Sequence, residues 1–189
     1  MIGKTLSAAL ALALVAAPAA AQEYPTSGFV LGAYVTGTGI TVEDGDEADS
    51  GRGLTLRLGY GFGNRFSAYV AGTGSSMEQG DYIAGHFDLG ARYLLSTARL
   101  RPYVEGALSG QALSIPVQGV DFETRGAGLT AAGGLEYSFS RKAALDVGLG
   151  WTFGEYNEGR IDGGEWVDLE EESFSSTSAR LSIGIVWRP

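Results

Sequence analysis

From residue 22 onward, apolar and polar side chains alternate along the chain with a period of two. The clearest stretch carries apolar residues at alternate positions: Leu54, Leu56, Leu58, Tyr60 and Phe62. Similar stretches run over residues 143–154 and 180–187. Successive side chains of a β-strand point to opposite faces of the sheet, so this pattern predicts an all-β protein with one apolar face.

Dividing the chain at its turn residues predicts eight strands, over residues 28–42, 52–62, 66–74, 82–95, 102–113, 122–139, 143–154 and 173–188. The connections between them alternate between longer and shorter. In an antiparallel up-and-down arrangement, alternate connections meet at the same end of the sheet. The longer connections, 43–51, 75–81, 114–121 and 155–172, hold most of the acidic residues, whereas the shorter ones, 63–65, 96–101 and 140–142, hold Arg65, Arg99, Arg101, Arg141 and Lys142 and no acid. One end is therefore expected to be acidic and the other basic.

The polar face of these strands is unusual because it is built mainly from Gly, Ala, Ser and Thr. Its ionisable members are few: Arg57, His86, Asp88, Arg92, Glu105, Glu136, Asp146 and Arg180. The face of a soluble sheet that contacts water would normally carry more charge. Small residues mixed with a few large ones suit the interior of an eight-stranded barrel, and they account for 30 Gly in 189 residues. The apolar face is then expected to contact lipid, which predicts an eight-stranded antiparallel up-and-down transmembrane β-barrel.

Aromatic residues of the apolar face gather near the strand ends. Six lie beside the short connections and two, Trp151 and Phe153, near the long ones; the full set is Phe62, Phe66, Tyr93, Tyr137, Phe139, Trp151, Phe153 and Trp187. Membrane barrels carry such aromatic girdles at both interfaces. Strands favour aromatic residues in any case, so the shared position of these residues near the strand ends is stronger evidence for a girdle than any single residue.

The N-terminus resembles a secretory signal peptide. Lys4 precedes an apolar run over residues 6–17, and small residues at 19–21 form a cleavage pattern before Gln22. We therefore expect residues 1–21 to be removed and residues 22–189 to form the barrel domain. The run is too short for a transmembrane helix.

Composition excludes several classes of function. Without Cys, the chain has no disulfide and no thiol nucleophile, and its net charge of −9 argues against a nucleic-acid partner. No pattern indicates a cofactor.

Taken together, the signal peptide, the eight alternating strands and the final strand over residues 179–187 resemble the small bacterial outer-membrane barrels of the OmpA, OmpX and opacity-protein type. This resemblance implies an outer-membrane location, contact with outer-membrane lipid and lipopolysaccharide, and a monomeric barrel. It also implies that the barrel-assembly machinery recognises the last strand, which ends here at the aromatic Trp187.

Three groups of residues are candidates for chemistry. The charges of the polar face could share one layer in the lumen, as a salt-bridge plug or as a gate for ions. His86 lies two residues from Asp88, so a His–Asp pair is possible, but the sequence shows no nucleophile beside it. The acidic residues Asp44, Asp46 and Asp49 form a weak Ca²⁺ candidate without the spacing of an EF-hand.

The function expected from these patterns is structural and surface-facing, without catalysis. The lipid-facing residues would anchor the protein, the lumen charges would close the barrel, and the acidic loops would contact partners. The alternatives are a narrow pore for small solutes, an outer-membrane lipid-modifying enzyme and a soluble periplasmic binding barrel.

Overall fold

The computed structural model describes residues 26–42, 48–78, 82–117, 120–169 and 173–189. The signal segment 1–21 and the Ca²⁺ candidates Asp44 and Asp46 lie outside the described residues. The described residues form nine strands: β1 (Gly28–Val42), β2 (Asp49–Phe62), β3 (Phe66–Met77), β4 (Ile83–Leu94), β5 (Leu100–Val117), β6 (Val120–Ser138), β7 (Ala143–Ile161), β8 (Val167–Asp168) and β9 (Phe174–Trp187). Among the described residues, no helix is long and apolar enough to cross a bilayer.

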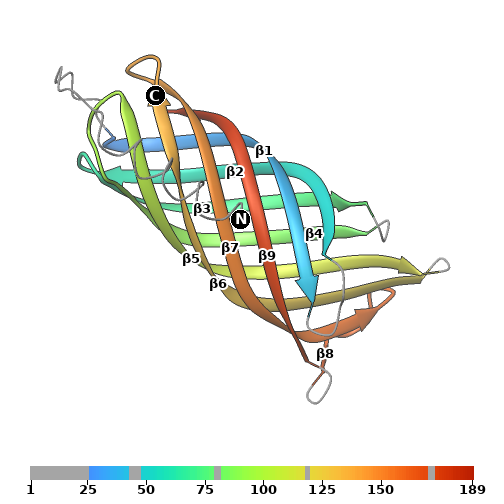
Figure 1. Cartoon of the computed structure of the whole chain (residues 1–189). Helices are drawn as coiled ribbons and strands as arrows, with labels where there is room; N and C mark the ends of the chain where they lie inside the picture. The colour runs from blue at the N-terminus through green and yellow to red at the C-terminus, as the bar shows by residue number, and fades with distance from the viewer. Residues whose placement is uncertain (1–25, 43–47, 79–81, 118–119, 170–172) are drawn as a thin grey trace, which may run out of the picture.

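Eight long strands form a closed antiparallel barrel (Figure 1). Each of β1 to β7 pairs with the next, β7 pairs with β9, and β9 pairs with β1 from Leu31 opposite Trp187 to Val42 opposite Ser176. Among the described residues, closure leaves no sheet edge along the middle of the barrel; in hydrocarbon, unpaired backbone groups would cost several kcal/mol each. The predicted fold class is confirmed.

Two of the predicted long connections were wrong. Residues 114–121 are mostly strand, because β5 and β6 continue as a paired hairpin up to Val117 and Val120. Residues 155–161 continue β7, and β8 pairs with it further along the predicted 155–172 loop. The long and short connections therefore alternate less regularly than the sequence indicated.

The extension of β6 and β7 is held by side chains on its outer surface. Arg125 Nε donates to Glu158 Oε2 at 2.6 Å, and Arg160 forms an ion pair with Glu123. Both guanidinium groups stack on the ring of Trp166, at 4.2 and 4.5 Å from its centroid. A register shift between Arg125 and Gly126 interrupts the alternation here, and the outer face beyond it carries charged residues, so an apolar stripe could not reveal the extension.

Close approach of neighbouring strands explains some of the glycines. A Cβ atom at Gly53 would lie 1.9 Å from the carbonyl oxygen of Gly74 on β3, so no larger residue fits there without moving the backbone. At the β2–β3 turn, Gly63 adopts a φ of 88°, which residues with a side chain rarely take.

The outer face of the barrel is a broad apolar surface. Leu54, Leu56, Phe87, Leu108 and Leu129 each expose more than half of their surface. All eight predicted girdle residues, Phe62, Phe66, Tyr93, Tyr137, Phe139, Trp151, Phe153 and Trp187, are exposed outward as well. An apolar surface of this extent is far larger than a soluble monomer carries, which disagrees with the soluble binding barrel.

Candidate functional site in the barrel lumen

The eight predicted polar-face residues all project into the barrel, because strand alternation puts them on the inner face. They come from β2 (Arg57), β4 (His86, Asp88, Arg92), β5 (Glu105), β6 (Glu136), β7 (Asp146) and β9 (Arg180). Glu136 and Asp146 have no exposed surface. These residues do not share one layer. They form a deeper group near the short connections and a shallower group nearer the long connections.

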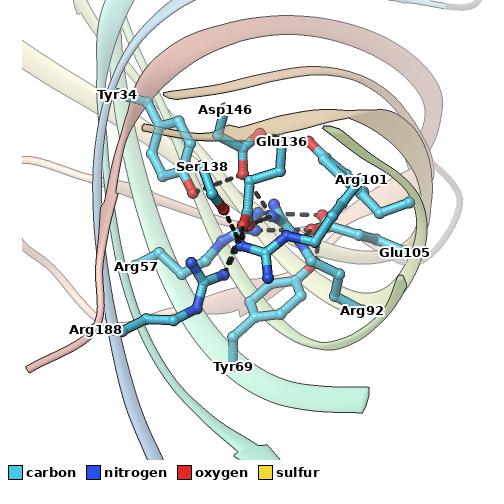
Figure 2. Close-up of polar contacts among 11 residues, drawn as sticks. Tyr34, Arg57, Tyr69, Arg92, Arg101, Glu105, Glu136, Ser138, Asp146 and Arg188 are labelled. Carbon is cyan, nitrogen blue, oxygen red and sulfur yellow. Dashed lines mark hydrogen bonds and ion pairs between the residues drawn. The ribbon is translucent and has the colours of Figure 1, made fainter. Parts of the chain in front are cut away.

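Arg92 is the centre of the deeper group (Figure 2). Its guanidinium contacts carboxylates from three consecutive strands: Glu105, Glu136 at 3.2 Å, and Asp146 at 2.5 Å. It also stacks on the ring of Tyr103, 3.7 Å from the centroid. One side chain of β4 therefore links β5, β6 and β7 through the lumen.

Arg57 enters the same group from the opposite wall. It donates two hydrogen bonds to the Glu105 carboxylate, at 2.7 and 3.1 Å, and stacks on the ring of Tyr69. Tyrosine hydroxyls complete the shell, since Tyr69 donates to Glu105 and Tyr103 donates to Asp146 at 2.7 Å. Paired geometry of this kind is the strongest form of charge-assisted hydrogen bond.

Two arginines of this group were missed by the sequence interpretation. Arg101 was placed in a connection, but it lies on β5, is buried, and bonds both Glu136 and Ser138. Arg188 follows the last strand and donates to both Glu136 oxygens, at 2.9 and 2.8 Å. The sequence did contain a signal for Arg101, because alternation along the strand puts its side chain on the same inner face as that of Glu105.

The shallower group is an ion pair set in a belt of hydroxyls. Arg180 on β9 binds Asp88 on β4 at 2.8 and 3.2 Å, and Asp88 also accepts from Ser109. At the same depth, hydroxyls of neighbouring strands bond one another in two series: Ser182–Thr36–Thr55–Thr73 and Ser109–Thr130–Thr152. Inward polar groups of every long strand contribute to this level.

His86 does not pair with Asp88, whose carboxylate is occupied by Arg180 and Ser109. Its Nε2 lies 3.2 Å from Ser178 Oγ. The sequence analysis did not predict this contact. Both residues are almost fully buried, and Nδ1 of His86 has no hydrogen-bond partner in the described structure to orient the ring. A reactive Ser–His pair needs such an orienting group and access for the substrate.

Between His86 and the long connections, an apolar cluster fills the lumen. It consists of Ile40, Met77, Ala84, Leu113 and Tyr156, with Tyr82, Ile115 and Phe174 packed against it. The two cavities that border the deeper charged group measure about 50 and 20 Å³, room for a few water molecules. Within the described ranges, no three His, Cys, Asp or Glu side chains are placed to hold a metal ion.

Comparison with known proteins shows which solved structures this chain is similar to. Neisserial surface protein A is 20% identical over 86% of this chain and 98% of its own, with a TM-score of 0.69. OprG from Pseudomonas aeruginosa is 11% identical over 86% of this chain and 96% of its own, with a TM-score of 0.56. Ail, the attachment invasion locus protein of Yersinia pestis, is 14% identical over 85% of this chain and 99% of its own, with a TM-score of 0.54.

At such identities the solved structures establish a shared fold. The comparison with curated proteins gave no match. The profile of the outer membrane protein beta-barrel domain matches residues 7–167, which is most of the sequence. The chain therefore belongs to the outer-membrane protein β-barrel domain family.

Proposed function

We propose that this outer-membrane protein is a closed, non-conducting barrel that holds an acidic contact surface at the cell exterior. Closure of the barrel is supported mainly by the position of Arg92, whose guanidinium binds carboxylates on β5, β6 and β7. A solute moving through the lumen would have to displace these pairs. Separating a buried ion pair leaves an uncompensated charge, at a cost of about 3–5 kcal/mol.

Two further layers support closure. The Asp88–Arg180 pair joins β4 to β9 within the hydroxyl belt, and the apolar cluster of Ile40, Met77, Ala84, Leu113 and Tyr156 fills the lumen near the long connections. Ions would meet a charged barrier, a hydrogen-bonded barrier and an apolar barrier in turn. This arrangement favours a plug over an ion path.

Conductance in planar bilayers tests closure. The refolded protein is expected to give no steady current, while the triple variant Arg92→Ala/Arg180→Ala/Tyr156→Ala opens small channels because one lumen-filling side chain is removed from each of the three barriers. A gel mobility shift on boiling checks that each variant forms a barrel. Large, stable channels in the unmodified protein would refute the plug and favour the narrow pore.

The surface role rests on the charge of the end that carries the long connections. Exposed carboxylates there include Glu78, Asp121, Glu155, Asp162, Glu165 and Asp168. An excess of acid favours cationic partners. A structure of Ail was solved with the heparin analogue sucrose octasulfate; for the present chain we expect no binding of such a polyanion, and calorimetry with that compound would reveal any.

Orientation is testable because the chain has no native Cys. In this family type short turns face the periplasm and longer loops the exterior. A membrane-impermeant maleimide should label Glu165→Cys on intact cells and label the matched variant Arg141→Cys after lysis alone. The reverse result would place the acidic end in the periplasm and refute the surface role.

We further infer that residues 1–21 direct export and are removed, so the mature protein should begin at Gln22 by N-terminal sequencing. Its remaining partners follow from its location: outer-membrane lipid, lipopolysaccharide, and the barrel-assembly machinery that recognises the last strand. A catalytic role for His86 is not part of the proposal. His86→Ala should leave the acyl composition of lipid A unchanged, whereas loss of a modification would favour the lipid-modifying enzyme.

A further inference from the structure

The end of the barrel that carries the short turns has a ring of exposed cations. The three turns there, residues 63–65, 95–99 and 139–142, contribute Arg65, Arg99, Arg141 and Lys142. These turns contain no Asp or Glu. The nearby inner carboxylate of Glu136 is buried and is already bound by three arginines. The positive charge of this rim is therefore not neutralised by the described residues around it.

The rim lies at the height of the aromatic girdle. Arg65 directly precedes Phe66, and the guanidinium of Arg99 stacks on the outward-facing ring of Tyr137, 5.0 Å from its centroid. Arg99 Nε donates to the carbonyl oxygen of Ser138 at 2.9 Å, which fixes the group against the outer wall. Aromatic girdles mark the level of the lipid headgroups, so this arginine lies beside headgroups and faces the bilayer.

Trp187 connects the girdle to the third turn. It pairs with Ala143, and the next residue, Arg188, donates its backbone N–H to the carbonyl oxygen of Lys142 at 2.7 Å. Lys142 and Arg141 therefore lie one and two residues before the position that pairs with Trp187. The same combination of a cation and an interfacial aromatic residue occurs at Arg65 and Arg99.

We infer that this basic rim, formed by Arg65, Arg99, Arg141 and Lys142, binds negatively charged phospholipid headgroups, such as phosphatidylglycerol, in the adjacent leaflet. Guanidinium groups suit phosphate oxygens because they donate paired hydrogen bonds. The geometry favours lipid over an anionic cell-wall polymer, because Arg99 lies against the side of the barrel. A polymer beneath the membrane would need cations directed along the barrel axis.

Fluorescence quenching by brominated lipids tests the inference on the intact protein. Trp151→Phe/Trp166→Phe leaves Trp187 beside the basic rim, and Trp166→Phe/Trp187→Phe leaves Trp151 near the opposite end. Each protein is refolded into phosphatidylcholine vesicles containing an equal mole fraction of brominated phosphatidylglycerol or brominated phosphatidylcholine. Vesicles with identical leaflets make the result independent of insertion direction.

Brominated phosphatidylglycerol should occupy the sites next to Trp187 about five-fold more than brominated phosphatidylcholine, since one basic residue near an anionic surface contributes ~1 kcal/mol. High salt should remove this preference, and so should replacing the four rim cations by Gln. The matched variant Arg125→Gln/Arg160→Gln, which removes cations at the other end, should keep it. Trp151 should show no preference.

Equal quenching of Trp187 by the two lipids would overturn the inference, as would a preference that survives both salt and the four Gln substitutions. Cosedimentation with purified peptidoglycan, lost in the four-Gln variant and without any lipid preference, would assign the rim to the polymer instead. The high-salt measurement uses the protein with its native rim residues, so the inference can still be tested if the four-Gln variant fails to fold. None of these outcomes depends on whether the lumen conducts.

Discussion

Replacing Arg92 by Met should be among the most damaging single changes in the lumen, and the structure shows why. Without Arg92, Glu105 keeps Arg57 and Glu136 keeps Arg101 and Arg188. Among the described residues, Asp146 is then left with tyrosine hydroxyls, from Tyr103 at 2.7 Å and Tyr34 at 3.4 Å. A buried carboxylate without a cation should lower the free energy of unfolding by about 3–5 kcal/mol.

The reciprocal change should cost much less. Asp146→Asn leaves Arg92 with two carboxylates, Glu105 and Glu136, so we expect a loss of about 1 kcal/mol, comparable to one hydrogen bond. The double variant Arg92→Met/Asp146→Asn no longer contains an unpaired charge at this position. Its stability should therefore lie well above that of Arg92→Met alone, although one charge more has been removed.

Reversible denaturation of the protein in detergent micelles or lipid vesicles, followed by tryptophan fluorescence, gives the four free energies of this double-mutant cycle. A coupling of about 2 kcal/mol or more between Arg92 and Asp146 is expected for residues in direct contact. Additive effects of the two substitutions would refute the reasoning, because they would show that Asp146 does not need Arg92. Equal losses from the two single variants would contradict it as well.

Three further predictions concern other parts of the barrel. Gly53→Ala should destabilise the barrel strongly, since its Cβ would lie 1.9 Å from the Gly74 carbonyl oxygen, whereas Gly72→Ala, with open space around the same atom, should be nearly neutral in the same denaturation assay. Trp166→Ala should make residues 162–169 more sensitive to protease while leaving global stability almost unchanged, because it removes the ring on which Arg125 and Arg160 stack; unchanged cleavage would contradict this role. Burial and the hydrogen bond with Asp49 raise the pKa of Tyr82 from 10.0 to about 12, so this phenol stabilises the fold below pH 10 and loses that contribution as the pH rises through 12. Asp49→Asn should lower that pKa in an ultraviolet absorbance titration, and a Tyr82 that titrates near 10 in the parent protein would disprove the raised value.

Much of the fold could be predicted because one physical rule governs the band that faces lipid. An uncharged outer face and a small, polar inner face produce a strict alternation, which located eight strands and assigned the inward direction of Arg57, Asp88 and Arg180. Beyond this band the outer face can be charged, as at Arg125 and Arg160. The alternation then no longer differs from that of a polar loop, which is why the extensions of β5, β6 and β7 were missed.

The contacts inside the lumen were less predictable. Which arginine binds which carboxylate depends on the relative shift of strands around the closed barrel. Arg57 on β2 reaches Glu105 on β5, and Asp88 on β4 reaches Arg180 on β9; no local spacing encodes either pair. Arg101 could have been placed from its phase with Glu105, and Arg188 from its phase with Arg180, because the predicted strand 173–188 includes it and both side chains are buried.

The pairing of β9 with β1 has a consequence for assembly. Two of the lumen arginines, Arg180 and Arg188, arrive with this final segment, and their partners Asp88 and Glu136 stand on β4 and β6. Before this segment has joined the sheet, Asp88 has no cation among the described residues and Glu136 lacks one of its three. Joining the ends of the sheet and balancing its internal charge are therefore a single event, which penalises half-closed intermediates and makes barrel formation cooperative.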